Sequence, residues 1–329
     1  MIEHAFARER GNSLRAVADT DWLDPERFEF LWVDVLRPTP ADIQSIYETF
    51  SLHELVRDDL LREVRHRPQL EELPGYFFGV LYAARFDQEE HAARGTELRF
   101  VWGANYLITV HAESIPEIDH LAARARSNSL TSVVAPHIRD VGVSDLVYRL
   151  IDALVDGYFP VIDELAEWID TVQNRMFHEN RTPEMVEAIL NVRTNLIQIR
   201  RVMAPSREVV NVLLRREHEL FTEELDPYFQ DVYEHTVRIT DIADTYRDVL
   251  SSTLATYTSL VSNDLNRTVR KMTAITVTLM TAALVVGFYG QNFDFMPLLH
   301  VTWGALWSLG LMAVSSAASL VIFRWIGWW

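Results

Sequence analysis

The sequence predicts an α+β membrane protein, in which an acidic soluble part precedes two helices that cross a bilayer. Three observations predict this class: charge is divided unevenly along the chain, a long helical pattern fills its middle, and two uncharged segments lie near its end. The 329 residues have a net charge of −17 and a mean hydropathy of −0.01. Residues 265–329 carry a net +3, which leaves −20 on residues 1–264. The near-neutral average therefore combines two different parts.

The composition excludes several classes of function. A soluble part this acidic argues against nucleic acid as a partner, because nucleic-acid affinity depends on basic contacts to phosphate. Without cysteine the chain has no disulfide, no thiolate zinc site and no cysteine nucleophile. The first residues, MIEHAFARERGNSL, lack the apolar core of a signal peptide, so we expect the soluble part to lie in the cytoplasm.

The first third of the chain predicts an α/β domain over residues 1–143. Four short segments are rich in β-branched and aromatic residues and are bounded by turn residues or charge, which is typical of strands. Thr39 predicts the N-cap of a helix that carries Ile43, Ile46 and Phe50. We find no P-loop, no G-x-G-x-x-G and no H-E-x-x-H in this domain. The four predicted strands are FEFLWVDV, YFFGVLYAARF, ELRFVWGA and NYLITVHA.

Residues 144–224 predict a helical layer. Apolar residues recur at three- and four-residue spacing in LVYRLIDALVDGYFPVIDELAEWIDTVQNRMF and in MVEAILNVRTNLIQIRRVM, which indicates amphipathic helices. Proline lacks the backbone N–H that a helix interior needs, so we expect Pro205 to mark a helix break.

Residues 225–272 predict a long stalk helix that continues into the membrane. Apolar residues recur there at alternating spacings of three and four, and after Pro227 neither proline nor glycine occurs before Gly287. A helix of about 60 residues spans on the order of 90 Å, far longer than a helix of a globular domain. We expect this helix both to reach the membrane and to oligomerise along its apolar seam, which consists of Leu225, Phe229, Val232, Ile239, Ala243, Tyr246, Leu250, Tyr257 and Leu260.

Two uncharged segments, residues 273–289 and 301–323, predict transmembrane helices over residues 273–289 and 301–326, joined by an external loop over residues 290–300. A helix needs about 17 to 25 apolar residues to cross the hydrocarbon layer. Tryptophans flank the second segment, as in interfacial belts, and all four basic residues lie on one side of the hairpin. The positive-inside rule then puts both termini in the cytoplasm of a multi-pass inner-membrane protein. The alternative is a buried hairpin of a soluble protein.

The first of these helices carries Thr273, Thr276, Thr278 and Thr281, a large polar load for a helix surrounded by lipid. Polar residues at membrane depth usually face other helices or water. Two helices cannot enclose a water-filled path, so a conducting hairpin requires a ring of identical subunits. The alternative is a two-helix anchor for the soluble part.

Eight segments, in order along the chain from about Phe28, resemble the CorA family of divalent-cation channels and transporters. The resemblance implies a homopentameric funnel in the bilayer that transports Mg²⁺, or Zn²⁺, Co²⁺ or Ni²⁺, with no cofactor other than the ion and no catalytic residues. The segments are WVDVLRPTPADI (32–43), FSLHELVRDDLL (50–61), RPQLE (67–71), NYLITVH (105–111), LIDALVDGYF (150–159), APSREVV (204–210), YFQDVYEHTVRITDIADTYRDVL (228–250) and YGQNFDFMPLL (289–299).

The family signature is a Gly-Met-Asn triplet at the end of the first span, which here reads Gly290, Gln291 and Asn292. Five copies of the asparagine would form a ring of carboxamide oxygens that can hydrogen-bond the water shell of Mg²⁺, an ion that loses its waters reluctantly. The glycine permits a backbone geometry that a side chain would block. The related ZntB branch also departs from methionine at the central position, so the ion's identity stays open.

The same resemblance implies pore-lining positions along the first span. Asn266 corresponds to the polar ring at the cytoplasmic end, Met272 and Met280 to hydrophobic constrictions, and Gly287 to a further pore-lining position. Rings of bulky apolar side chains can gate a pore by dewetting. Asp294 is the acid that remains in the external loop. The alternative for each methionine is ordinary contact with lipid or another helix.

The resemblance also implies a regulatory metal site between subunits. Asp58 and Asp59 correspond to an acidic pair that faces Asp231 of a neighbouring subunit in magnesium-gated members. Carboxylates brought together repel unless a hard cation neutralises them, so bound metal would hold the ring closed. Asp152 and Asp156 are weaker candidates for the same role. The alternative is a solvated acidic helix start and an acidic stalk face.

The histidines, among them His53, His111 and His235, show no paired ligand spacing, and we expect most of them to be structural. Two functions from other classes remain as alternatives: a non-conducting, membrane-anchored metal sensor or scaffold, and a cytosolic hydrolase with a membrane tether. The absence of a nucleophile or metal-ligand motif argues against the hydrolase. Nothing in the motifs decides between a channel and a proton-coupled transporter.

Overall fold

In a computed structural model of the chain, two compact units are present, residues 1–251 and residues 252–329. The structure describes residues 2–9, 13–17, 21–62, 66–127, 130, 142–178, 183–215, 220, 223–291 and 301–328.

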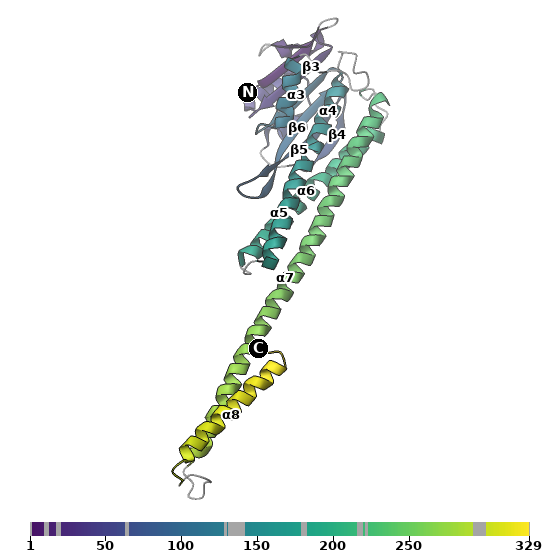
Figure 1. Ribbon diagram of the computed structural model, residues 1–329. Coiled ribbons are helices and arrows are strands. Elements are labelled where there is room, and N and C mark those ends of the chain that lie inside the picture. Colours follow the sequence, from purple (N-terminus) through teal and green to yellow (C-terminus); the bar gives the residue numbers. More distant parts are fainter. Residues whose placement is uncertain are drawn as a thin grey trace. The chain divides into compact units, whose positions relative to one another are not determined.

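The first unit contains a seven-stranded sheet with the order β2-β1-β3-β7-β6-β5-β4. All neighbouring strands are antiparallel except β3 and β7, which run parallel. The four strands that the sequence predicts form the sheet's centre and part of one side (Figure 1). The strands are β1 (Ile2–Arg8), β2 (Arg15–Ala16), β3 (Phe30–Leu36), β4 (Gln69–Leu73), β5 (Tyr76–Asp87), β6 (Ala92–Gly103) and β7 (Tyr106–His111).

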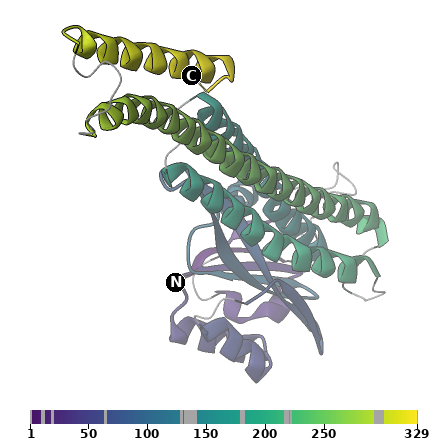
Figure 2. The same cartoon turned by 90° about the horizontal axis from the view of Figure 1, so that it is seen from below.

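Helices cover both faces of the sheet. Figure 2 shows α1 (Pro40–Thr49) and α2 (Glu54–Leu61) on one face and the later helices of the unit on the other. Thr39 caps α1 as predicted: its hydroxyl accepts the Asp42 N–H at 3.2 Å while the Asp42 carboxylate accepts the Thr39 N–H at 2.9 Å. The α1–α2 face buries one apolar cluster that includes Val33, Ile43 and Ile46.

Four helices follow: α3 (Pro116–Arg126), α4 (Val143–Asp156), α5 (Tyr158–His178) and α6 (Pro183–Arg215). They pack on the other face of the sheet within the same unit, so the predicted division at residue 143 falls inside one body, between α3 and α4 of the same helical layer. The expected break at Pro205 is wrong, because Pro205 lies inside α6. Met203 and Val209 are buried on either side of it. The packing of both halves therefore outweighs the one backbone hydrogen bond that proline removes.

The stalk is a single helix, α7 (Asp226–Tyr289), which begins in the first unit and ends in the second. Its predicted seam is largely buried within one chain. Tyr148 of α4 packs edge-on against Phe229, and Arg200 of α6 pairs with Asp244 at 2.6 Å. The expectation that this seam oligomerises is therefore wrong up to Leu250, because α4, α5 and α6 of the same subunit cover it.

The second unit contains the end of α7 and the helix α8 (Gly304–Trp325). Both helices are long and apolar enough to cross a membrane. Their large apolar side chains are mostly exposed, as expected for surfaces that meet lipid or other subunits.

Candidate functional site

The predicted site residues lie in three places: along the second half of α7, on α2, and where α4 meets α7. We describe each place within its own unit. Asn292 and Asp294 lie outside the described residues.

The signature begins where α7 ends. Gly290 donates its N–H to the Val286 carbonyl at 2.9 Å and Gln291 donates to Phe288 at 3.4 Å, so both residues continue the last helical turn. A Cβ at Gly290 would lie 3.1 Å from the Val286 carbonyl oxygen, and the φ of Gly290 is not in the left-handed region. A side chain at position 290 would therefore require the preceding turn to shift by a few tenths of an ångström.

The predicted pore positions share one side of α7. At about 100° per residue, Asn266, Met280 and Gly287 fall within about 60° of arc, and Met272 widens the stripe to about 120°. All four are exposed in the single chain, with Met272 at 64% and Met280 at 63%. Ala274 is fully buried on the roughly opposite side of the helix. One face of α7 is therefore covered within unit 2, and the predicted pore face is open.

Three of the four threonines of the first span satisfy their polarity within the helix. The hydroxyls of Thr273, Thr278 and Thr281 donate to the carbonyls of Val269, Ala274 and Thr278 at 2.8 Å. Such bonds remove the unpaired polar groups that lipid would penalise. These three threonines consequently give no reason by themselves for a water-filled path, whereas Thr276 is exposed on the side of α7 that carries the predicted pore positions.

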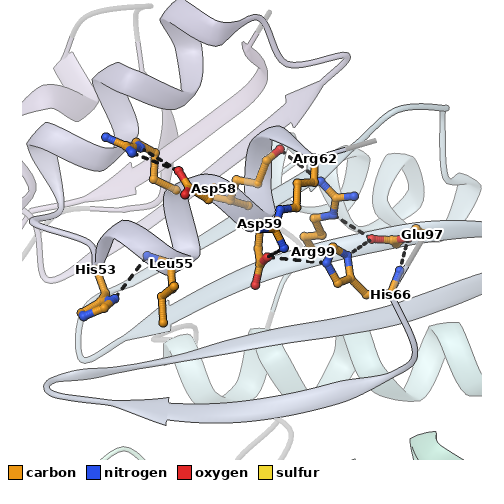
Figure 3. A network of polar contacts seen from close by, with 10 residues as sticks. His53, Leu55, Asp58, Asp59, Arg62, His66, Glu97 and Arg99 are labelled. Atoms are coloured by element: carbon orange, nitrogen blue, oxygen red, sulfur yellow. Dashed lines mark hydrogen bonds and ion pairs between the residues drawn. The ribbon is translucent and has the colours of Figure 1, made fainter. Parts of the chain in front are cut away.

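Figure 3 shows the acidic pair on α2 and its partners. Asp58 accepts from Arg57 at 3.0 Å, and Asp59 lies 3.5 Å from Arg62 and 3.6 Å from Nε2 of His66. The Asp59 side chain is 21% exposed, so one side of its carboxylate still reaches solvent.

His66 connects Asp59 to a second carboxylate, Glu97 on β6 (Figure 3). Burial opposes ionisation of Glu97, but the hydrogen bond and charge of Arg99 outweigh it, together with bonds from Tyr82 and His66, and lower the pKa of Glu97. Arg99 also donates to the Leu60 carbonyl at 3.1 Å. The strand thus holds the C-terminal end of α2, which carries Asp59, in place.

The third place gathers residues of α4 and α7. His235 Nδ1 lies 2.8 Å from Asp156, and its Nε2 lies 3.8 Å from Asp231, one turn earlier on α7. Ligand atoms of Asp152, Asp156 and His235 all lie within 4.8 Å of one another, which suits a metal ion. Burial, followed by the charges of Asp156 and Asp231, raises the pKa of Asp152 to about 6 against the opposing effect of His235.

The sequence reasoning missed His235, which it assigned a structural role. A usable signal existed: Asp231 and His235 are four residues apart on one helix, as are Asp152 and Asp156 on another, so each pair shares a helix face. The sequence could not show that these two helix faces, one on α4 and one on α7, contact each other. Within one chain, Asp59 and Asp231 have different partners, so an Asp59–Asp231 site requires a second subunit.

An α/β domain followed by one continuous helix, α7, whose end is apolar, and by a second apolar helix, α8, defines a class of membrane proteins. Comparison with known families places the chain within this class. The chain belongs to the CorA family, because the family model "CorA-like Mg2+ transporter protein" matches residues 28–324. Members of this family are ion transporters or channels, not enzymes.

Individual relatives agree with this assignment. The chain is 32% identical over 298 residues to the cobalt/magnesium transport protein CorA of Thermotoga maritima, covering 90% of this chain and 83% of that protein. Its fold matches the complete CorA magnesium transporter of Methanocaldococcus jannaschii with a TM-score of 0.84 at 20% identity, over 99% of this chain and 98% of that one. The cytoplasmic domain of ZntB from Vibrio parahaemolyticus matches with a TM-score of 0.64 at 14% identity, over 80% and 98%.

Proposed function

We propose that this chain transports divalent cations across a membrane through a pore enclosed by five copies of α7. The observation that carries this proposal is the continuity of α7, which is a single helix from the acidic unit to the Gly290-Gln291-Asn292 signature. Ion-dependent rearrangement of the soluble unit can therefore act directly on the helix that lines the pore. No chemical step is involved, and transport of a divalent ion is driven by about 4.6 kcal/mol per 100 mV of membrane potential.

The exposed surface of α7 supports a ring of subunits. Val261, Leu265, Val269 and Met272 form an apolar stripe on the segment before the membrane, and each is exposed in the single chain. Exposed stripes at this spacing on a long helix are typical of helix–helix interfaces. The pentameric state itself rests on membership of the family.

The side chain of Leu265 is 64% exposed in the single chain, and in the proposed ring a helix of another subunit covers it. A charged aspartate at this position would oppose that contact, so Leu265→Asp should dissociate the ring. Native mass spectrometry of the protein in detergent measures the outcome: five subunits for the wild type and mostly single subunits for the variant. Leu190→Asp, at an exposed leucine of α6, is the matched control and should leave the pentamer intact. A Leu265→Asp pentamer would contradict the proposed packing.

We infer an inner-membrane location with both termini in the cytoplasm. Arg267, Arg270 and Lys271 precede the first span, Arg324 ends the second, and residues 290–300 contain no basic residue apart from His300. Basic residues near spans favour the cytoplasmic side. The soluble unit would then meet the ions that the protein has admitted.

We further propose that a cytosolic cation binds at Asp231 and regulates transport. The crowding of Asp152, Asp156 and Asp231 around His235 supports a cation there, because it would neutralise carboxylates that otherwise repel. Asp58 and Asp59 would approach this cluster from the neighbouring subunit. The bound cation would thereby link two subunits and stabilise one arrangement of the ring.

Purified protein in liposomes, assayed for uptake of Mg²⁺, Co²⁺, Ni²⁺ and Zn²⁺, tests the proposed function. We expect potential-driven uptake of at least one of these ions. Uptake of Zn²⁺ without Mg²⁺ would assign the substrate to zinc, and dependence on a pH gradient would indicate proton coupling. No uptake of any ion would overturn the transporter in favour of the alternative, a non-conducting metal sensor or scaffold of the same fold.

A further inference from the structure

Three neighbouring strands bring Glu3, Asp34 and His111 together at one end of the sheet. The strands β1, β3 and β7 are adjacent in that order, and ligand atoms of the three residues all lie within 4.8 Å of one another. The register of β1 against β3 shifts between Ile2 and His4, so Glu3 lies at a β-bulge beside Asp34. Bulges re-aim side chains and are frequent next to functional sites.

The ring of His111 is oriented as in metal-binding histidines. Its Nδ1 lies 2.6 Å from the carbonyl oxygen of Glu113, which can only accept, so Nδ1 carries a hydrogen. This bond turns Nε2 toward Asp34, whose Oδ1 lies 3.0 Å away. A hydrogen bond from the other ring nitrogen to a carbonyl is the usual support for a metal-ligating histidine. A cation, either a proton or a metal ion, therefore belongs between Nε2 and Asp34.

Among the described residues, only one oxygen of the Asp34 carboxylate, Oδ1, has hydrogen-bond partners. Its Oδ1 accepts the Thr109 hydroxyl at 2.5 Å, and Thr109 in turn accepts the Trp32 Nε1–H at 3.1 Å. Its Oδ2 is buried and has no hydrogen-bond partner among the described residues. A buried carboxylate oxygen without a partner is costly, so a further positive ligand at this oxygen would be stabilising.

We propose that Glu3, Asp34 and His111 form a binding site for a divalent transition-metal ion such as Zn²⁺ or Co²⁺, separate from the pore and from the α4–α7 cluster. One imidazole nitrogen and two carboxylates are a ligand set that Zn²⁺ accepts, with water in the fourth position. Ligands about 2.0–2.1 Å from a tetrahedral ion lie about 3.3 Å apart, a separation that small side-chain shifts would reach here. Glu3 is exposed, which gives the ion access from solvent.

Metal binding by the full-length protein in detergent tests the site without any measurement of transport. The reference is the His235→Ala variant, because this substitution weakens the α4–α7 cluster, which could also bind metal. Zn²⁺ affinity is measured by competition with a chromophoric zinc indicator, and bound Co²⁺ by its visible absorption. Glu3→Gln and Asp34→Asn should each lower the Zn²⁺ affinity at least about tenfold and remove the absorption of four-coordinate Co²⁺.

Asp119→Asn is the matched control. Asp119 lies near Glu3 and His4, in an adjoining group that could also hold a cation, but it is no member of the proposed set. It should leave both measurements unchanged. Because Glu3 is exposed, Glu3→Gln keeps the test valid if Asp34→Asn fails to fold. Unchanged Zn²⁺ affinity in Glu3→Gln would overturn the proposal and assign a proton to the His111–Asp34 pair. If Asp119→Asn lowered the Zn²⁺ affinity while Asp34→Asn left it unchanged, the proposal would be overturned in favour of the adjoining group of Glu3, His4 and Asp119.

Discussion

Asn292→Ala is expected to abolish ion uptake into liposomes while leaving the pentamer assembled. The proposed ring of five carboxamides hydrogen-bonds the water shell of the entering ion, and a methyl group cannot replace these bonds. If each carboxamide contributes about 1 kcal/mol, the ring contributes about 5 kcal/mol, which corresponds to more than a ~10³-fold change in ion affinity. Uptake of Mg²⁺ or Co²⁺ should therefore fall to the level of empty liposomes.

Gln291→Met is the matched control at the adjacent position. Its backbone continues the last turn of α7, and the substitution restores the Gly-Met-Asn triplet of the family. We expect it to retain uptake, with any change confined to the order of preference among ions. Uptake by Asn292→Ala within about twofold of the wild type, a difference below ~0.5 kcal/mol, would rule out the carboxamide ring as the selective element.

Local signals in the sequence were sufficient for some elements of the fold, but they did not predict the strands β1, β2 and β4. The spacing of Thr39 and Asp42 fixes the start of α1, and the lack of proline or glycine between Pro227 and Gly287 allows α7 to continue without interruption. Both are properties of one helix and its own backbone. The family resemblance added the order of the domains along the chain. It also predicted membership of the CorA family, which the family model confirms.

Tertiary contacts decide the features that the sequence could not predict. The seam of α7 has the spacing of an interface between subunits, yet α4, α5 and α6 of the same chain bury it as far as Leu250. Spacing identifies an apolar face and leaves its partner undetermined. Three of the four threonines of the first span likewise look polar in the sequence, but their hydroxyls bond to the preceding turn.

The candidate metal-binding groups depend still more on long-range contacts. Asp152 and His235 are separated by most of the helical layer, and Glu3, Asp34 and His111 come from three strands. No short motif connects such residues, so a search for ligand spacing cannot find them. The signature residues, by contrast, are consecutive in the chain, so the family resemblance could name them as candidates from the sequence alone.

Asp152→Asn is expected to change the thermal stability of the protein in opposite directions with and without metal. In metal-free protein at about pH 7.5 the variant should unfold at a higher temperature than the wild type, because one of three crowded carboxylates loses its charge. Relief of about 1 kcal/mol corresponds to a rise of about 2–4 °C for a domain of this size. Millimolar Mg²⁺ or Co²⁺ should stabilise the wild type and leave the variant nearly unchanged.

The pH dependence of the unfolding temperature provides an independent check on the direction of this effect. The pKa of Asp152 is raised from its ordinary value of 3.8 to about 6, so ionisation of this carboxyl destabilises the fold increasingly as the pH rises from about 3.8 to about 6, and by a constant amount above that range. The advantage of Asp152→Asn in metal-free protein should therefore shrink as the pH falls below about 6 and disappear only below about 3.8, where the carboxyl is protonated in both the folded and the unfolded chain. Asp163→Asn, an exposed acid of α5, is the matched control and should show neither effect. Equal stabilisation of wild type and Asp152→Asn by metal would mean that the regulatory cation binds elsewhere.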